Sequence, residues 1–334
     1  AEAYSNMGVA LQNQGKLDQA IEAHKKSISL KPNYAEAYGN MGNALKDQGK
    51  LDQAITSYNK SISLKPDDVD AYNNMGVALK DQGKLEEAIE AYNKCISLNP
   101  NYAETYSNKG VVLNDQGKLD ESIIAYKKAI SLKPDYAEAH KNLSLTLLNS
   151  GKLQEGFDEF EWRWKTKQFL SQQRYFSQPL WDGIQSLNGK RILLWCEQGI
   201  GDTLNWSSYL PLITSQVKHC ILECQEKLVP LLERSFPNVE VKAVNKSLDL
   251  ERDDFDFHLP MGSLYKNFIH EIEQNTKIDA YLIPDPVRVN FWKERLNSLG
   301  KGPYIGICWK SSVISAFRLQ HYPPISDWSP ILTI

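Results

Sequence analysis

The sequence predicts an α-helical solenoid followed by an α/β domain, and three observations support this division. The first is a motif that recurs about every 34 residues in the first half of the chain. The second is a change near Gly189, after which short apolar runs alternate with helical patterns, as in a parallel α/β sheet. The third is a junction rich in aromatic residues between the two parts. A chain of 334 residues is long enough for two or three domains.

Each repeat is expected to form a helical hairpin. In the first repeat, Gly8 and Ala20 are small where two helices must touch, Gly15 breaks the chain between them, and Pro32 stops the second helix. Four clear repeats span residues 1–34, 35–68, 69–102 and 103–136, and a degenerate fifth begins at Ala137 with Ser144 in place of the glycine. The recurring glycines are Gly8, Gly42, Gly76 and Gly110, and the recurring prolines are Pro32, Pro66, Pro100 and Pro134.

This pattern of an aromatic, a glycine, an alanine and a closing proline resembles the tetratricopeptide repeat, which has the same period. The sixth residue of every repeat, on its first helix, is also an asparagine, although asparagine is a mediocre helix former. Stacked along a groove, these amides would offer donors and acceptors to an extended peptide backbone. A similar ladder lines the repeats of O-linked N-acetylglucosamine transferase. The alternative is recent duplication, since the neighbouring DQGKL stretch is copied almost unchanged. The ladder consists of Asn6, Asn40, Asn74, Asn108 and Asn142.

The junction between the two parts is expected to hold them together. Phe157, Phe160, Trp162 and Trp164 crowd one short helical stretch, and an exposed aromatic patch of this size would reduce solubility. These side chains are therefore predicted to fasten the last repeat to the next domain as one rigid body. The predicted boundaries are residues 1–170 for the solenoid, 171–302 for a Rossmann-like α/β lobe, and 303–334 for the incomplete start of a second lobe.

The α/β part is organised around the stretch RILLWCEQGIGDTL. The apolar run 191–195 predicts a buried parallel strand, and Gly199, Gly201 and Asp202 follow it before a helical pattern that continues to about Thr214. A strand, a glycine turn and a helix start can cradle an anion or a hydroxyl-rich ligand. Alternatively, the glycines only make a tight turn and Asp202 caps the helix. Further strands are predicted at 219–222, 239–243 and 256–259, and helices at 227–235 and 286–299.

Several motifs together resemble bacterial proteins in which tetratricopeptide repeats precede a glycosyltransferase of the two-lobed GT-B type, related to heptosyltransferases and, more distantly, to O-linked N-acetylglucosamine transferase. The motifs are PLWDG at 179–183, EQGIGDT at 197–203, FDFHLPMGSL at 255–264 and IGICWK at 305–310. The resemblance implies that Asp202 is the general base for an acceptor hydroxyl. It also implies a nucleotide-sugar donor, with no metal and no other cofactor. The residues implied to bind substrate or donor are Gly199, Gly201, Thr203, Lys310, Arg318 and His321.

Each donor-side residue also has a structural interpretation. Lys310 would be a solvated strand end, Arg318 a partner in an ion pair and His321 a surface residue. The second lobe, which supplies most nucleotide contacts in such enzymes, is largely missing after Gly302. The chain as given is therefore expected to be weak or inactive in transfer unless a longer natural chain exists. A non-catalytic interaction scaffold is the alternative function.

Composition excludes some partners. The formal net charge is −3 and there is no polybasic run, so neither nucleic acid nor an anionic membrane is an expected partner. The five cysteines are scattered in apolar surroundings, which predicts reduced thiols in the cytoplasm rather than a zinc site. Neither a signal peptide nor a membrane-spanning run is seen, although the chain begins at Ala1 inside a repeat. The oligomeric state stays open.

Overall fold

The computed structural model describes residues 1–245, 252–274 and 280–300. Contacts between Cα atoms divide the chain into two compact units, Ala1–Tyr281 and Leu282–Ile334. The first unit contains both the helical repeats and a parallel sheet, and the second contains the helix α16. The predicted strand at 304–310, the predicted lobe at 303–334, and the residues Lys310, Arg318 and His321 lie outside the described residues.

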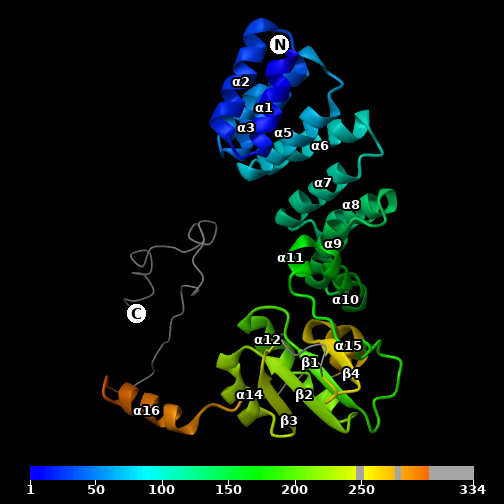
Figure 1. The fold of residues 1–334 in the computed structure, drawn as a ribbon, viewed down its shortest axis with the longest axis vertical. Helices are drawn as coiled ribbons and strands as arrows, with labels where there is room; N and C mark the ends of the chain where they lie inside the picture. Colours follow the sequence, from blue (N-terminus) through cyan, green and yellow to red (C-terminus); the bar gives the residue numbers. More distant parts are fainter. Residues whose placement is uncertain (246–251, 275–279, 301–334) are drawn as a thin grey trace. The chain divides into compact units, whose positions relative to one another are not determined.

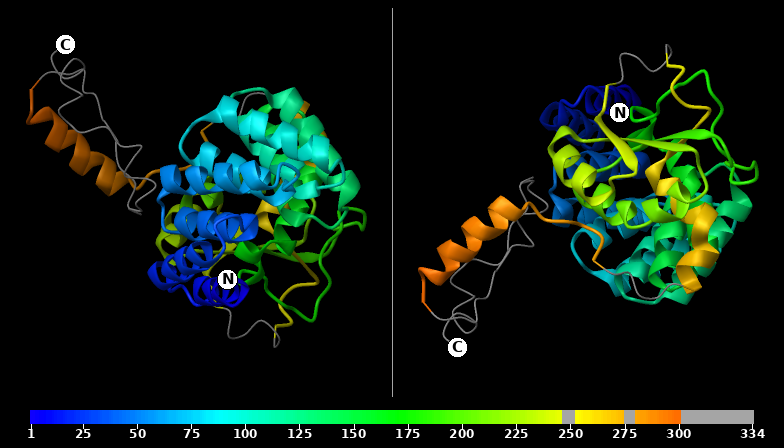
Figure 2. Two further views of the ribbon diagram at one scale, coloured as in Figure 1. Left: turned by 90° about the horizontal axis from the view of Figure 1, so that it is seen from above. Right: turned by 90° about the horizontal axis from the view of Figure 1, so that it is seen from below.

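The helices of residues 1–160 come in pairs, one pair for each expected repeat, and the pairs follow one another in chain order (Figures 1 and 2). The solenoid of helical hairpins expected from the sequence is therefore present. The pairs are α1 (Glu2–Asn13) with α2 (Leu17–Leu30), α3 (Ala35–Asp47) with α4 (Leu51–Leu64), α5 (Val69–Asp81) with α6 (Leu85–Leu98), α7 (Ala103–Asp115) with α8 (Leu119–Leu132), and α9 (Ala137–Asn149) with α10 (Leu153–Phe160).

The recurring glycines allow the two helices of a pair to approach closely. A Cβ atom on Gly42 would lie only 2.6 Å from a ring carbon of the fully buried Tyr58. The same geometry recurs at Gly76 and Gly110, whereas Gly8 faces the ring of His24. The turn between the helices contains a second glycine with a left-handed backbone, such as Gly15 with φ of 73°. Only glycine adopts that conformation without strain.

The copied DQGKL stretch has a structural role between neighbouring repeats. Its glutamine donates a hydrogen bond to the acidic residue at the start of the second helix in the preceding repeat. Gln48 Nε2 lies 2.7 Å from Asp18 Oδ1, and Gln82 Nε2 lies 2.8 Å from Asp52 Oδ1. Gln116 makes the corresponding bond to Glu86. These bonds join successive hairpins and give a physical reason for the stretch to recur.

The sheet contains four strands in the order β3-β2-β1-β4, and each neighbouring pair is parallel. β1 and β3 have the predicted bounds, β2 runs two residues further than predicted, and β4 is shifted by one residue. The strands are β1 (Arg191–Trp195), β2 (His219–Cys224), β3 (Val239–Ala243) and β4 (Phe257–Pro260). The connecting elements are α12 (Ile200–Ser207), α13 (Leu210–Thr214), η2 (Glu226–Leu228), α14 (Val229–Ser235), η4 (Met261–Ser263) and α15 (Leu264–Gln274).

The helix predicted to run continuously to about Thr214 is instead split into α12 and α13. Pro211 lies in the first turn of α13 and has no N–H group for the carbonyl one turn earlier. A proline is tolerated in a first turn but not in a helix interior, so the chain ends α12 and starts again.

Both faces of the sheet are buried, and the junction covers one of them. Leu193 and Trp195 point to one face, where Trp164 and Phe176 pack against them together with Ile221 and Phe255. Ile192 and Leu194 point to the opposite face and are also fully buried. The junction elements after α10 are η1 (Glu161–Lys165) and α11 (Lys167–Leu170).

Aromatic contacts show that the junction fastens the last repeat to the sheet, as the sequence predicts. The Trp164 and Trp195 ring centroids are 5.5 Å apart, and Phe157 stacks on Tyr265 of α15 at 4.7 Å. His140 of the last repeat stacks on Trp162 at 3.7 Å. The repeats and the sheet therefore share a continuous set of contacts within the first unit.

Among its described residues, the second unit contains one helix, α16 (Pro286–Asn297). Asp285 caps it by accepting hydrogen bonds from the backbone N–H groups of Val287 and Arg288. None of its residues is buried, and Val287 and Phe291 are exposed. In the described part of the chain, every helix is too short or too polar to cross a bilayer.

Candidate functional site

The order of the strands creates a switch point, the position at which an open parallel α/β sheet usually binds its ligand. From β1 the chain moves outward to β2 and β3, and it then returns to the other side of β1 as β4. The connections therefore reverse direction between β1 and β4. Ligands of open α/β sheets bind at such a switch point, outside the carboxyl ends of the strands. Here that position is flanked by the loop 196–199 after β1 and by η4 after β4.

The loop after β1 is held by hydrogen bonds within the protein. Gly199, rather than Asp202, is the N-cap of α12, and Asp202 is the third residue of the helix. Gly199 donates its backbone N–H to Asp202 Oδ2 at 3.1 Å, so Asp202 supports the cap from within the first turn. The Asp202 side chain is nevertheless exposed. Thr203 is fully buried, and its Oγ1 lies 3.1 Å from both the Gly199 carbonyl oxygen and Gln225 Oε1. Gln225 in turn donates to the Gln198 carbonyl at 2.7 Å.

The glycines of this loop are not required by the surrounding protein. Neither Gly199 nor Gly201 is among the glycines with positive φ, so their backbone conformations are open to other residues. A Cβ atom on Gly201 would meet no atom of the described residues within 4 Å, and one on Gly199 would meet only Asp202 Oδ2 at 3.5 Å. Gly199 at the end of the loop and Gly201 in the first turn of α12 thus present bare backbone to open space, which is the arrangement that lets a ligand approach closely.

A buried ion pair under this loop was not singled out from the sequence. Arg163 of η1 is fully buried, and its Nη2 lies 3.0 Å from Glu197 Oε1 and 2.9 Å from Ser263 Oγ. The backbone N–H of Gly262 donates to the same Glu197 oxygen at 3.1 Å. Arg163 therefore links the end of the solenoid to the loops after β1 and β4. The only sequence signal for it is a charged residue surrounded by aromatic ones.

The environment of Glu197 disfavours its charge. Burial raises the pKa of the Glu197 carboxyl to about 7, although Arg163 and the Gly262 N–H act in the opposite direction. Its second oxygen, Oε2, is buried without a hydrogen-bond partner among the described residues. The guanidinium carbon of Arg163 lies 4.3 Å from the Phe160 ring centroid and 4.6 Å from that of Trp164, which adds cation–π contacts.

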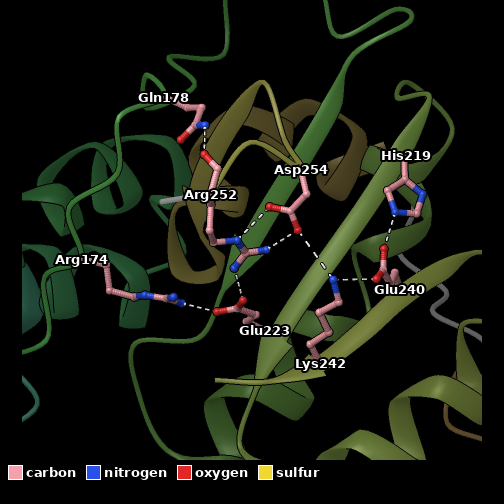
Figure 3. Close-up of polar contacts among 8 residues, drawn as sticks. All are labelled: Arg174, Gln178, His219, Glu223, Glu240, Lys242, Arg252 and Asp254. Carbon is pink, nitrogen blue, oxygen red and sulfur yellow. Dashed lines mark hydrogen bonds and ion pairs between the residues drawn. The ribbon is translucent and has the colours of Figure 1, made fainter. Parts of the chain in front are cut away.

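A second charged network anchors β2 and β3 (Figure 3). Glu223 pairs with Arg174 at 2.6 Å and also with Arg252. Arg252 holds Asp254 at 2.8 Å and lowers the pKa of that carboxyl. Lys242 joins Asp254 to Glu240, which also contacts His219. Each acid in this network has a basic partner, so we interpret it as a structural anchor for the segments around Arg174 and Arg252.

The asparagine ladder connects the first helices of successive repeats. Asn40 Nδ2 donates to Ser5 Oγ at 3.3 Å, Asn74 Nδ2 to Asn43 Oδ1 at 3.0 Å, and Asn108 Nδ2 to Asn73 Oδ1 at 3.2 Å. In each case one amide N–H reaches the preceding repeat. Asn6 is exposed, whereas the other four are half-buried. Among the described residues, no bond to the side-chain oxygens of Asn40 and Asn108 is observed. The described residues also contain no group of three or more side chains arranged to hold a metal ion.

Comparison with known proteins identifies the repeats. Models of the tetratricopeptide repeat match residues 1–34 and 69–102, and also 25–56 and 91–124. A further repeat model matches residues 42–83 and 110–151. Protein FlbA of Caulobacter vibrioides is 34% identical over 194 residues, which cover 53% of this chain and 32% of FlbA. The chain therefore spans about a third of the length of that relative.

Solved structures similar to this chain cover about half of it. A MamA crystal structure is 30% identical with a TM-score of 0.45, and it covers 50% of this chain and 97% of its own. A thermophilic TPR protein of Thermus thermophilus is 22% identical with a TM-score of 0.43, covering 50% of this chain and 91% of its own. None of these matches names a glycosyltransferase, so that resemblance stays a prediction. The family matches and the paired helices together show that the N-terminal half of this chain consists of tetratricopeptide repeats.

Proposed function

We propose that this protein binds a protein partner and holds an extended segment of it along the first helices of the repeats. Tetratricopeptide repeats support protein–protein interaction in general, and the asparagine ladder supplies the specific surface. A stacked row of amides recognises a peptide backbone rather than particular side chains. The four cysteines in the described part of the chain are free thiols, in keeping with a reducing cytoplasm as the place of action.

The observation that carries this proposal is the register of the asparagines together with their bonding. Asn40 and Asn108 use one N–H to reach the preceding repeat, which fixes the orientation of each amide. Their side-chain oxygens have no partner among the described residues and are left to accept hydrogen bonds from a peptide. Duplication alone explains why the asparagines recur, but it does not explain why their side-chain oxygens have no hydrogen-bond donor among the described residues.

The test is a triple substitution in the ladder. Changing Asn40, Asn74 and Asn108 to Ala is expected to weaken peptide binding at least about tenfold, since several hydrogen bonds are lost together. The control replaces Asn33, Asn59 and Asn101, which are exposed and lie outside the first helices, with Ala. Because the ladder also bridges repeats, helical content and melting temperature must be compared for both variants. If the two variants bound peptide with equal affinity, the ladder would have no role in binding and its recurrence would be explained by duplication alone.

We also propose, as a second candidate, that the α/β part binds the acceptor side of a nucleotide-sugar-dependent transfer. The observation in its favour is the bare backbone at Gly199 and Gly201, at the switch point between β1 and β4, with Asp202 exposed beside it. Asp202 would take the proton of the attacking hydroxyl. Lys310, Arg318 and His321 would then face the donor, and no metal or further cofactor is assigned.

Asp202→Asn separates the catalytic role from the capping role. An Asn side chain keeps an acceptor oxygen for the Gly199 N–H, so a purely structural role of Asp202 predicts little loss of stability or activity. A general base predicts an unchanged melting temperature and a loss of turnover of about a hundredfold or more. The assay uses the full-length natural protein with a panel of nucleotide-sugars. Turnover within a fewfold of the wild type would restrict Asp202 to the capping role.

A further inference from the structure

Acidic residues occupy two fixed positions on the first helices of the repeats. At the second and thirteenth positions of the five repeats, eight of the ten residues are acidic and none is basic. The two exceptions are Asn13 and Asn149. The acidic residues at the second position are Glu2, Glu36, Asp70, Glu104 and Glu138, and those at the thirteenth are Asp47, Asp81 and Asp115.

These positions lie on the same side of each helix as the asparagine ladder. An α-helix turns about 100° per residue, so positions two and six differ by about 40° and positions two and thirteen by about 20°. The first helices of successive repeats are neighbours, as the bonds from Asn40 to Ser5 and from Gln12 to Asp47 show. The ladder therefore runs between two rows of carboxylates. We call this combined surface the acidic face.

The carboxylates of the acidic face are accessible to a partner. All of them are exposed except that of Glu104, which is half-buried. Their present partners are lysines, hydroxyl groups and, for Asp47, the Gln12 amide; examples are Lys80 with Asp81 at 3.0 Å and Tyr102 with Asp70 at 2.9 Å. Exposed pairs of this kind are weak and exchange readily. Over the five first helices the eight acidic residues face four lysines, a formal net charge of −4.

We propose that the partner segment is a basic, extended polypeptide with lysine or arginine at about every third residue. The proposal rests on peptide binding by the asparagine ladder, and it adds the charge and spacing of the bound segment. Packed helices lie about 8–10 Å apart, and a chain in the extended polyproline II conformation advances about 3.1 Å per residue and turns once every three residues, so every third side chain lies on the same side. About three residues therefore pass each repeat, and one basic side chain in three meets the carboxylates of one repeat. The same charge disfavours acidic peptides and nucleic acid.

The first experiment compares three labelled peptides built from Gly, Ser and Ala, each about 15 residues long so that an extended chain passes all the repeats. The probes carry Lys, Gln or Glu at every third residue. The Lys peptide is expected to bind about tenfold or more tightly than the Gln peptide at low salt, because several weak ion pairs add. The Glu peptide is expected to bind more weakly than both. Salt at about 0.5 M should remove most of the difference by screening exposed charges.

The second experiment locates the effect on the acidic face. Glu36→Gln, Asp70→Asn and Glu104→Gln are combined in one variant, and Glu87→Gln, Glu90→Gln and Glu121→Gln, on second helices, form a control with equal loss of charge. The first variant should lose the preference for Lys and keep its affinity for the Gln peptide, and the control should keep both. Equal binding of Lys and Gln peptides to the wild type, or equal effects of both variants, would overturn this inference while leaving peptide binding intact. If the wild-type protein bound none of the three peptides, the proposed function itself would be overturned.

Discussion

Replacing Glu197 with Gln should change how the stability of the α/β part depends on pH. Burial raises the pKa of Glu197 from its ordinary 4.5 to about 7, so the folded protein binds this proton more tightly than the unfolded chain does. The stabilisation from protonated Glu197 is complete below pH 4.5 and is lost as the pH rises to about 7. Above that pH it changes no further. The substituted amide cannot ionise, and it keeps the shape and the acceptor oxygen that Arg163 and Gly262 contact.

The size of the effect follows from the rise in pKa. One pKa unit corresponds to about 1.4 kcal/mol, so a rise from 4.5 to about 7 corresponds to about 3 kcal/mol. The free energy of unfolding of the wild type should therefore fall by about 3 kcal/mol relative to Glu197→Gln between pH 4.5 and 7.

The assay is urea unfolding followed by tryptophan fluorescence at intervals between pH 4 and 8. All eight tryptophans lie at or beyond residue 162, so the signal reports the junction and the α/β part rather than the repeats. Glu240→Gln is the control. Lys242 lowers the pKa of Glu240, so the stabilisation from ionised Glu240 is complete above about pH 4.5 and is lost only as the pH falls below that value, and the difference from wild type should therefore stay constant between about pH 4.5 and 8. A constant difference between wild type and Glu197→Gln from pH 4 to 8 would refute the reasoning.

Three further substitutions test the geometry of the fold. Gly42→Ala should lower the free energy of unfolding by about 1–3 kcal/mol, because its Cβ would lie 2.6 Å from the Tyr58 ring. Gly39→Ala is the control and should cause no loss, because its Cβ would meet only Ser61 Oγ at 3.5 Å. Thermal melts followed by circular dichroism compare the two variants. Glu223→Gln should cost about 3 kcal/mol or more in urea unfolding, since it leaves Arg174 buried without its carboxylate, and an effect under about 1 kcal/mol would contradict the role of the network as an anchor. Gly201→Ala should leave the melting temperature unchanged or raise the stability by up to about 1 kcal/mol, and a clear loss would show that the loop is not open at this position.

The repeats were predictable because their information is local. Each of the first four hairpins uses the same spacing of small residue, aromatic ring, left-handed glycine and proline, and the regular recurrence of that spacing along the chain reinforces the signal. The strands β1 and β3 were predictable for a similar reason, because each is a short run with a strand pattern bounded by polar or turn-forming residues. The break between α12 and α13 was missed, although Pro211 is a local signal for it.

The buried contacts beneath the loop after β1 were not predictable from local sequence patterns. Arg163 and Glu197 are 34 residues apart, and Arg163 and Ser263 are 100 apart, so their meeting depends on how the junction packs on the sheet. The bonding of the ladder was missed for a related reason. A repeated asparagine is visible in the sequence, but its bond to Ser5 or Asn73 depends on the spacing of neighbouring helices.

Photo-crosslinking tests most directly whether a peptide lies along the first helices. A photoreactive residue is introduced at Asp81, an exposed position on α5 beside the ladder, or at Glu87, an exposed position on α6. The protein is then irradiated with either the Gln peptide or the Lys peptide described above. Our account predicts that both peptides are captured from position 81 and not from position 87. Equal capture from the two positions, or capture from position 87 alone, would contradict it.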